Sequence, residues 1–182
     1  MPSSLVISVR DLSVDEIPAV VNYWFHSPPG FIERMGVDPA KMPKESEMKS
    51  GLLQKIQENK LLTVSKLNAL AILCDGHAIG MHTINPLIEN DYGIFHAHIW
   101  ESHFRRQGIG MRSYPLACRV FIERFGLKRI LFKTPIHNIG AIRTKEKLGI
   151  RKLGEEVIGF SIIKDNTLAQ VFELTTEEAK KL

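Results

Sequence analysis

A glycine-bearing turn with two adjacent arginines, Arg105-Arg106-Gln107-Gly108-Ile109-Gly110, contains the residues best suited to binding an anion. Glycine lets the main chain approach a ligand without a Cβ in the way. Where such a turn opens a helix, backbone N–H groups converge on a phosphate, and the helix dipole and the arginines add positive charge. This glycine turn (Arg105–Gly110) therefore favours a diphosphate ligand over a carboxylate.

Two common phosphate-binding motifs do not fit the glycine turn. No Gly-Lys-Ser/Thr sequence follows it, which excludes a P-loop, and the third glycine of a dinucleotide fingerprint is missing. The fragment by itself also fits a tight bend that needs glycine only for its backbone. Both interpretations stay open until the context of the turn is considered.

The residues on either side of the glycine turn indicate a strand and a helix. Ile94–Trp100 is a β-branched and aromatic run, which is typical of a buried strand. Met111–Phe125 has helical periodicity. Its expected apolar face consists of Leu116, Ala117, Val120, Phe121 and Phe125.

Further strands and helices are predicted along the rest of the chain. We expect strands at Leu5–Val9, Ala69–Cys74, His77–Ile84, Arg129–Lys133, Leu153–Ile163 and Leu168–Leu174. We expect helices after a Ser13–Glu16 capping box, over Lys44–Asn59, and from an Asn138 cap to Leu148. Turns are expected at Asp75-Gly76, Pro86–Gly93 and Asp165-Asn166. The pattern predicts one mixed α/β (α+β) domain over residues 1–182.

Composition narrows the class of protein. The chain has 182 residues, 44% hydrophobic and 24% charged, with no apolar run near the ~20 residues that a membrane span needs. Cys74 and Cys118 are too few for a disulfide framework and lack metal-ligand spacing, so we expect a cytoplasmic protein without a metal. The net charge of +4 is mild and its basic residues lack interleaved aromatics, which disfavours nucleic-acid binding.

Two segments at matching spacing resemble the motifs of the GNAT superfamily of acyl-CoA-dependent N-acyltransferases. The glycine turn resembles the family signature Gln/Arg-x-x-Gly-x-Gly/Ala. Asn138–Ile150 is similar to a second family segment, Asn-x-x-Ala-x-x-x-Tyr-x-x-x-Gly-Phe. The expected order of elements agrees from about residue 5 to residue 174. The resemblance implies a single domain with a mixed, mostly antiparallel sheet, two splayed strands and flanking helices.

The resemblance also implies an acyl donor, acetyl-CoA, and the residues that hold it. The strand end at His98, Ile99 and Trp100 is expected to splay from its neighbour and pair with the pantetheine arm. The diphosphate is expected at Arg105, Arg106, Gln107, Gly108, Ile109, Gly110 and Met111. Asn138 is expected near the thiol, and it is also suited to be the N-cap of its helix.

Lys145 replaces the tyrosine that is frequent in the family and can protonate the leaving thiolate. A lysine at this position could supply a proton or hold a phosphate, and the alternative is a solvated lysine on the helix surface. Tyr114 is not assumed to substitute for the missing tyrosine. The acid therefore stays unassigned at the level of the sequence.

Three residues are candidates for the base that keeps an attacking amine neutral. Strand alternation puts His96, His98 and Trp100 on one face and the intervening Phe95, Ala97 and Ile99 on the other. A histidine beside the cofactor has a suitable unperturbed pKa of ~6.5. Glu101, directly after the strand, is the third candidate, as a proton relay.

The amine acceptor stays open. Phe25–Lys60 and Ile158–Leu168 are expected to form the acceptor side. A protein N-terminal amine, a lysine side chain and a small amine such as an aminoglycoside or polyamine all fit. An alternative from another class is an acyl-CoA-binding sensor or assembly module that catalyses nothing. An exposed sheet edge would suit a homodimer.

Overall fold

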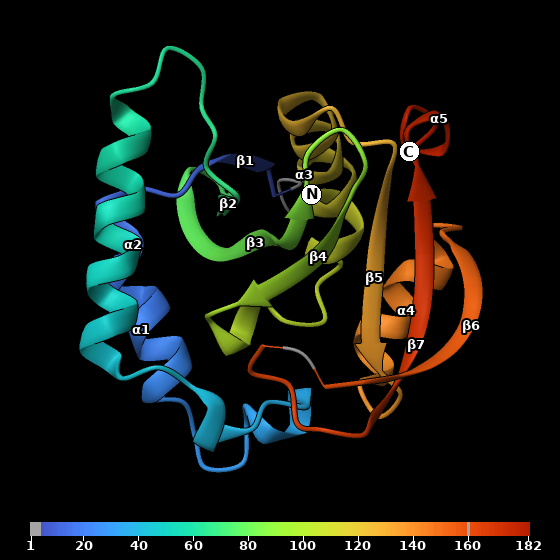
Figure 1. Ribbon diagram of the computed structural model, residues 1–182, viewed down its shortest axis with the longest axis horizontal. Coiled ribbons are helices and arrows are strands. Elements are labelled where there is room, and N and C mark those ends of the chain that lie inside the picture. Colours follow the sequence, from blue (N-terminus) through green and yellow to red (C-terminus); the bar gives the residue numbers. More distant parts are fainter. Residues whose placement is uncertain (1–4, 160) are drawn as a thin grey trace.

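A seven-stranded mixed sheet in the order β1-β2-β3-β4-β5-β7-β6 runs through the molecule (Figure 1). The computed structural model describes residues 5–159 and 161–182. Neighbouring strands are antiparallel except β4 and β5, which are parallel. The strands are β1 (Ile7–Asp11), β2 (Ala69–Cys74), β3 (His77–Ile88), β4 (Tyr92–Ile99), β5 (Arg129–Pro135), β6 (Arg151–Ile158) and β7 (Thr167–Thr175).

Helices connect and cover these strands. The α-helices are α1 (Ile17–Phe25), α2 (Glu45–Lys60), α3 (Ile109–Phe125), α4 (Ile139–Lys147) and α5 (Thr176–Ala179). Short 3-10 helices lie at Val14–Glu16, Glu33–Met35, Pro39–Lys41 and Ser102–Phe104.

Strand β2 shows that the sheet is covered on both faces. All six of its residues are buried. Leu70 packs in one hydrophobic cluster with residues of α3, whereas Ala71 packs in another with residues of α1 and α2. Successive side chains of a strand point to opposite faces, so α1 and α2 cover one face and α3 the other. Figure 1 shows α1 and α2 side by side, on the side of the molecule away from β6 and β7.

Strands β4 and β5 pair only at their beginnings. The parallel register joins Tyr92 to Arg129, and it ends where Ile94 meets Leu131. Beyond this point the two strands diverge, as Figure 1 shows, which confirms the expected splay. A β-bulge explains where the divergence begins, because Asn85 and Pro86 of β3 together oppose one residue of β4 between the Ile84 and Leu87 pairs. Such a bulge bends and twists the strands that carry it.

The mixed α/β fold and most of the expected elements are confirmed. The Ser13–Glu16 capping box is present, and Asn138 caps α4, as predicted. Helix α2 lies within one residue of its expected bounds. Gly149 follows α4 with a φ of +69°, a conformation that suits glycine at a helix end.

Several expected boundaries were wrong. The turn expected at Pro86–Gly93 is short, because β3 continues through the bulge to Ile88. The first strand lies two residues later than expected. The strand expected over Leu153–Ile163 ends at Ile158, and residue 160 lies outside the described residues.

The buried face of α3 is rotated relative to the expected one. Tyr114 and Cys118 are buried, whereas Leu116 and Val120 are only partly buried. The tertiary context selects this face, because α3 packs on the aromatic side chains of β4 and β5.

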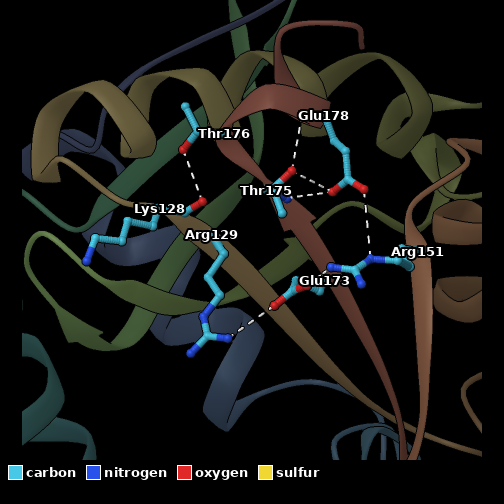
Figure 2. Close-up of polar contacts among 7 residues, drawn as sticks. All are labelled: Lys128, Arg129, Arg151, Glu173, Thr175, Thr176 and Glu178. Atoms are coloured by element: carbon cyan, nitrogen blue, oxygen red, sulfur yellow. Dashed lines mark hydrogen bonds and ion pairs between the residues drawn. The ribbon is translucent and has the colours of Figure 1, made fainter.

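Ion pairs join the last three strands of the sheet at the end where β5 begins. The carboxylate of Glu173 on β7, 6% exposed, lies between Arg129 of β5, at 3.3 Å, and Arg151 of β6 (Figure 2). Arg151 also lies 3.8 Å from Glu178, whose carboxylate accepts from the backbone N–H and the hydroxyl of Thr175. Opposite charges on adjacent strands stabilise their pairing. These contacts hold β5, β7 and β6 together at the end of β5 that still pairs with β4.

Phe121, which is fully buried, supports the face of the sheet under α3. Its ring lies 6.0 Å from that of Phe95. We expect Phe121→Ala to lower the free energy of unfolding by about 3–5 kcal/mol, because it leaves a cavity in the core. Urea denaturation measures this, with Leu61→Ala at an 86% exposed position as the control. A loss no larger than that of the control would contradict the packing described.

Candidate functional site

A cavity of about 210 Å³ lies between the diverging ends of β4 and β5. Its walls include Phe95–His98 of β4, Lys133–Pro135 of β5, and Asn138, Ala141 and Lys145 of α4. Tyr114, in the second turn of α3, also contributes to the lining. The cavity thus gathers polar groups from β4, β5, α3 and α4 that the divergence of the sheet leaves accessible.

Two loops far apart in the sequence join beside the cavity. Val37 forms an isolated antiparallel bridge with Ile163, and both residues line the cavity. The N–H of Asp38 donates to the carbonyl of Ile162 at 2.8 Å, and the ammonium of Lys41 donates to that of Ile163 at 3.1 Å. The two segments expected on the acceptor side therefore lie against each other at the cavity.

The glycine turn leads into α3, and the N-cap residue of this helix has a left-handed backbone conformation. Gly108 is the N-cap residue with a φ of +74°, and no side chain of the described residues caps this helix end. Helix starts leave backbone N–H groups unpaired and carry positive partial charge. Gly110 lies against α4, because a Cβ on it would be 3.1 Å from the Cγ2 of Thr144. The arrangement leaves the first turn of α3 suited to an anion beside α4.

The side chain of Arg105 folds back from the turn and hydrogen-bonds the end of β4. Its guanidinium donates to the carbonyl of Ile99 from Nε and Nη2, at 3.1 and 3.0 Å, and to the carbonyl of Trp100 at 3.1 Å. It also lies 4.4 Å from the ring centre of Phe31. Gln107 donates to the carbonyl of His103 at 2.5 Å, in the 3-10 helix that precedes the turn. The structure therefore ties the turn to the end of β4.

The tautomer of His96 is fixed by its partner. Its Nε2 lies 2.7 Å from the backbone carbonyl of Asn85, a pure acceptor, so Nε2 carries the hydrogen and Nδ1 holds the lone pair of the neutral ring. The β-bulge frees this carbonyl, since Asn85 has no partner in the described β3–β4 register. Burial lowers the pKa of His96, the Asn85 hydrogen bond opposes the shift, and the charge of Lys145 adds to it.

His98 faces α1 on the same side of the sheet as Trp100. Its Nδ1 lies 3.2 Å from the hydroxyl of Tyr23, and its ring meets that of Trp24 edge-on at 4.8 Å. Burial lowers the pKa of His98 to about 3, so the ring is neutral at physiological pH. Phe95 packs in the cluster under α3 instead, which confirms the predicted alternation along β4.

Glu101 lies apart from the histidines of the cavity. Its carboxylate is 3.1 Å from Nε2 of His77 and 3.5 Å from Nε2 of His103, and it is not among the described residues that line the cavity. His82 of β3 is fully buried and hydrogen-bonds Ser113 at 2.9 Å. The structure thus brings together His96, His98, Asn138 and Lys145, and it leaves Glu101 outside.

Lys145 is buried, so the surface lysine considered as an alternative is wrong. It is 4% exposed, and its Nζ donates to the carbonyl of Ala141 at 3.1 Å. Nζ also lies 5.6 Å from the ring centre of Tyr114 and 5.7 Å from that of Phe132. Burial lowers the pKa of Lys145 to about 7, against a smaller opposing effect of Cys118. The sequence carried one indication that Lys145 lies with Asn138 and Ala141 at the cavity, because positions 138, 141 and 145 share one helical face.

Neither a metal centre nor a membrane helix is found in the described part of the chain. Across residues 5–159 and 161–182, no three His, Cys, Asp or Glu side chains are grouped so that they could hold a metal ion. Among the helices of the same residues, none is both long and apolar enough to cross a bilayer.

Comparisons with known proteins agree with this architecture. The family model described as "Acetyltransferase (GNAT) family" matches residues 42–150, more than half of the chain. A search of the curated proteins finds no match. Solved structures with a similar fold include the ribosomal-protein-S5-alanine acetyltransferase of Vibrio fischeri, with 14% identity, 97% of this chain and 98% of that chain covered, and a TM-score of 0.70.

Two further similar structures contain coenzyme A. One is a ribosomal L7/L12 α-N-protein acetyltransferase, with 15% identity, 97% of this chain and 98% of that chain covered, and a TM-score of 0.69. The other is the aminoglycoside acetyltransferase AAC(6′)-Ib, with 11% identity, the same coverage, and a TM-score of 0.70. At such identities the likeness concerns the fold alone.

The burial of Lys145 predicts that the difference in stability between the parent chain and a Lys145→Met variant depends on pH. Below pH 7 Lys145 is charged in the folded chain as well as in the unfolded chain. Between about pH 7 and 10.5 the folded chain has lost this proton whereas the unfolded chain keeps it, because burial lowers the pKa of Lys145. The free energy of unfolding therefore rises with pH across this window. We expect Lys145→Met to be more stable than the parent at pH 6.5, on the order of a few kcal/mol. This advantage should shrink steadily towards pH 9.5 in urea denaturation. A constant difference would contradict the lowered pKa.

Proposed function

Because the chain belongs to the acetyltransferase (GNAT) family, we propose that it transfers an acetyl group from acetyl-CoA to a primary amine. The observation that supports this most strongly is the cavity between the diverging ends of β4 and β5. It opens beside a helix start that no described side chain caps. The helix start suits a diphosphate, and the cavity between the strands suits an extended arm with peptide-like amides.

The glycine turn and β4 bind the donor in this proposal. The N–H groups of Gln107, Gly108, Ile109, Gly110 and Met111 hold the diphosphate, and Arg106 adds charge. Arg105 acts indirectly, since its hydrogen bonds to Ile99 and Trp100 fix the turn against β4. The edge of β4 that faces β5 has no register partner after Ile94 in the described sheet, so its backbone as far as the N–H of Ile99 can pair with the pantetheine amides. At the expected strand end, Arg105 already occupies the carbonyls of Ile99 and Trp100, and the N–H of Trp100 donates to Ile79.

Acetyl-CoA supplies an activated thioester, and the chain supplies position and proton transfer. The amine attacks the thioester carbon, the C–N bond forms as the C–S bond breaks, and the amine must lose a proton. His96 is the favoured base, directly or through water, because Asn85 orients its unprotonated Nδ1. His98 accepts or donates a hydrogen bond as a neutral ring. Glu101 takes no part, given its place outside the cavity.

The charges of the cavity favour an acceptor with a single amine, such as a protein N-terminus. None of the described residues that line it is acidic, and of its two lysines, Lys133 is paired with Glu156 at 2.7 Å whereas Lys145 has no carboxylate among its described neighbours. Aminoglycosides and polyamines carry several positive charges, which a wall without carboxylates does not balance. Apolar residues from the joined loops, including Val37 and Ile162, suit a short side chain beside the amine.

The amine specificity is tested by measuring thiol release from acetyl-CoA. We expect peptides with a free N-terminal amine to accelerate release, and N-terminally blocked peptides, aminoglycosides and polyamines to leave it near the background rate. Acetyl-CoA binding without acceleration by any amine would contradict catalysis and favour the non-catalytic acyl-CoA-binding module.

The diphosphate site is tested by Gly108→Glu. No described atom lies within 4 Å of a Cβ added there, so the change places a carboxylate at the start of α3 with little steric conflict. We expect CoA affinity to fall by at least ~100-fold, since a like charge ~5 Å from a phosphate costs about 3 kcal/mol at an effective dielectric of ~20.

Gly149→Glu is the matched control for this change. Gly149 has a similar φ of +69° and equally open surroundings, at the far end of α4. The Gly149→Glu change imposes a similar backbone strain but places no charge at the start of α3. Calorimetric titration with CoA compares the CoA affinities of the two variants. Equal affinities in the two variants would contradict the assigned diphosphate site.

A further inference from the structure

Lys145 enters the cavity where α3, α4 and β5 meet. Its ammonium is held by one hydrogen bond, to the Ala141 carbonyl of its own helix. The rings of Tyr114 and Phe132 flank it. Because the side chain is 4% exposed yet lines the cavity, the cavity is its route to any ligand.

The groups packed around Lys145 do not neutralise its charge. From α3 these are Tyr114 and Cys118, from β5 Phe132, and from β4 His96. None of these described neighbours is a carboxylate, and burial lowers the pKa of His96 and raises those of Tyr114 and Cys118, which keeps all three neutral near pH 7. Lys145 is the member of this group that exchanges a proton near neutrality, because burial lowers its pKa to about 7.

The start of α3 lies against the turn of α4 that carries this lysine. Thr144, adjacent in sequence, lies against Gly110 in the first turn of that helix. Negative charge nearby stabilises the ammonium form. Binding of a diphosphate donor therefore favours the protonated lysine before chemistry begins.

We propose that Lys145 donates the proton that the leaving thiol of acetyl-CoA requires, an inference that rests on the proposed acetyl transfer. As the acceptor nitrogen bonds to the acetyl carbon, the C–S bond breaks and its electron pair stays on sulfur. The ammonium of Lys145 protonates that sulfur and becomes a neutral amine. The proton lost by the acceptor leaves through His96 or water, and Lys145 is recharged from solvent after product release.

The kinetic test compares Lys145→Met with Lys147→Met, an exposed lysine on the same helix. We expect Lys145→Met to lower kcat by about 100-fold or more, the usual contribution of a positioned acid, with little change in KM for acetyl-CoA. The alkaline fall in the parent's kcat profile, caused by deprotonation of the acid, should disappear. Lys147→Met should match the parent. An unchanged kcat, or an alkaline fall retained in Lys145→Met, would overturn the proposal.

A second measurement uses the parent protein and does not depend on turnover. In chain labelled with ¹³C at lysine Cε, the resonance lost in Lys145→Met is titrated with and without CoA. We expect a pKa near 7 in the free protein and a higher value with CoA bound. A titration unaffected by bound CoA would overturn the role of Lys145. Absence of acetyl transfer in the parent despite the expected titration would instead count against the proposed function.

Discussion

The separation of β4 from β5 after three paired residues is the constraint on which the site depends. Parallel neighbours normally continue their ladder, which would fill this space with backbone hydrogen bonds. The bulge at Asn85 and Pro86 turns β4 away at the point where pairing stops. The ion pairs of Glu173 keep β5 with β7 and β6 on the other side. One local irregularity thus opens a cavity in the middle of an otherwise continuous sheet.

The same bulge connects the fold to the chemistry. It leaves the carbonyl of Asn85 outside the ladder, and that carbonyl sets the tautomer of His96. The cavity that the divergence creates is lined on the α4 side by a lysine that no described acidic group neutralises. Burying an unpaired charge costs stability, and the proton transfer proposed for Lys145 gives that charge a role. In the proposed reaction a base and an acid lie in one cavity, each with a pKa lowered by burial.

Periodicity and caps were enough to predict most of the fold. The Ser13–Glu16 box, the α2 segment and the alternation of His98 with Phe95 all depend on local patterns, which the structure keeps. The bulge escaped prediction because Asn85-Pro86 has the composition of a turn, and only pairing with β4 makes it part of a strand. The burial of Lys145 depends on the packing of α4 against α3 and β5, which the helical face it shares with positions 138 and 141 does not by itself specify. Arg105 likewise finds its carbonyl partners only after the turn folds back on β4.

A crystal structure with bound CoA tests the central claim most directly. The account predicts the diphosphate on the backbone amides of Gln107–Met111, the arm along the free edge of β4, and the sulfur within hydrogen-bonding reach of Nζ of Lys145. A CoA molecule whose sulfur lay outside the space between β4 and β5, with Lys145 still enclosed by Tyr114 and Phe132 alone, would contradict it.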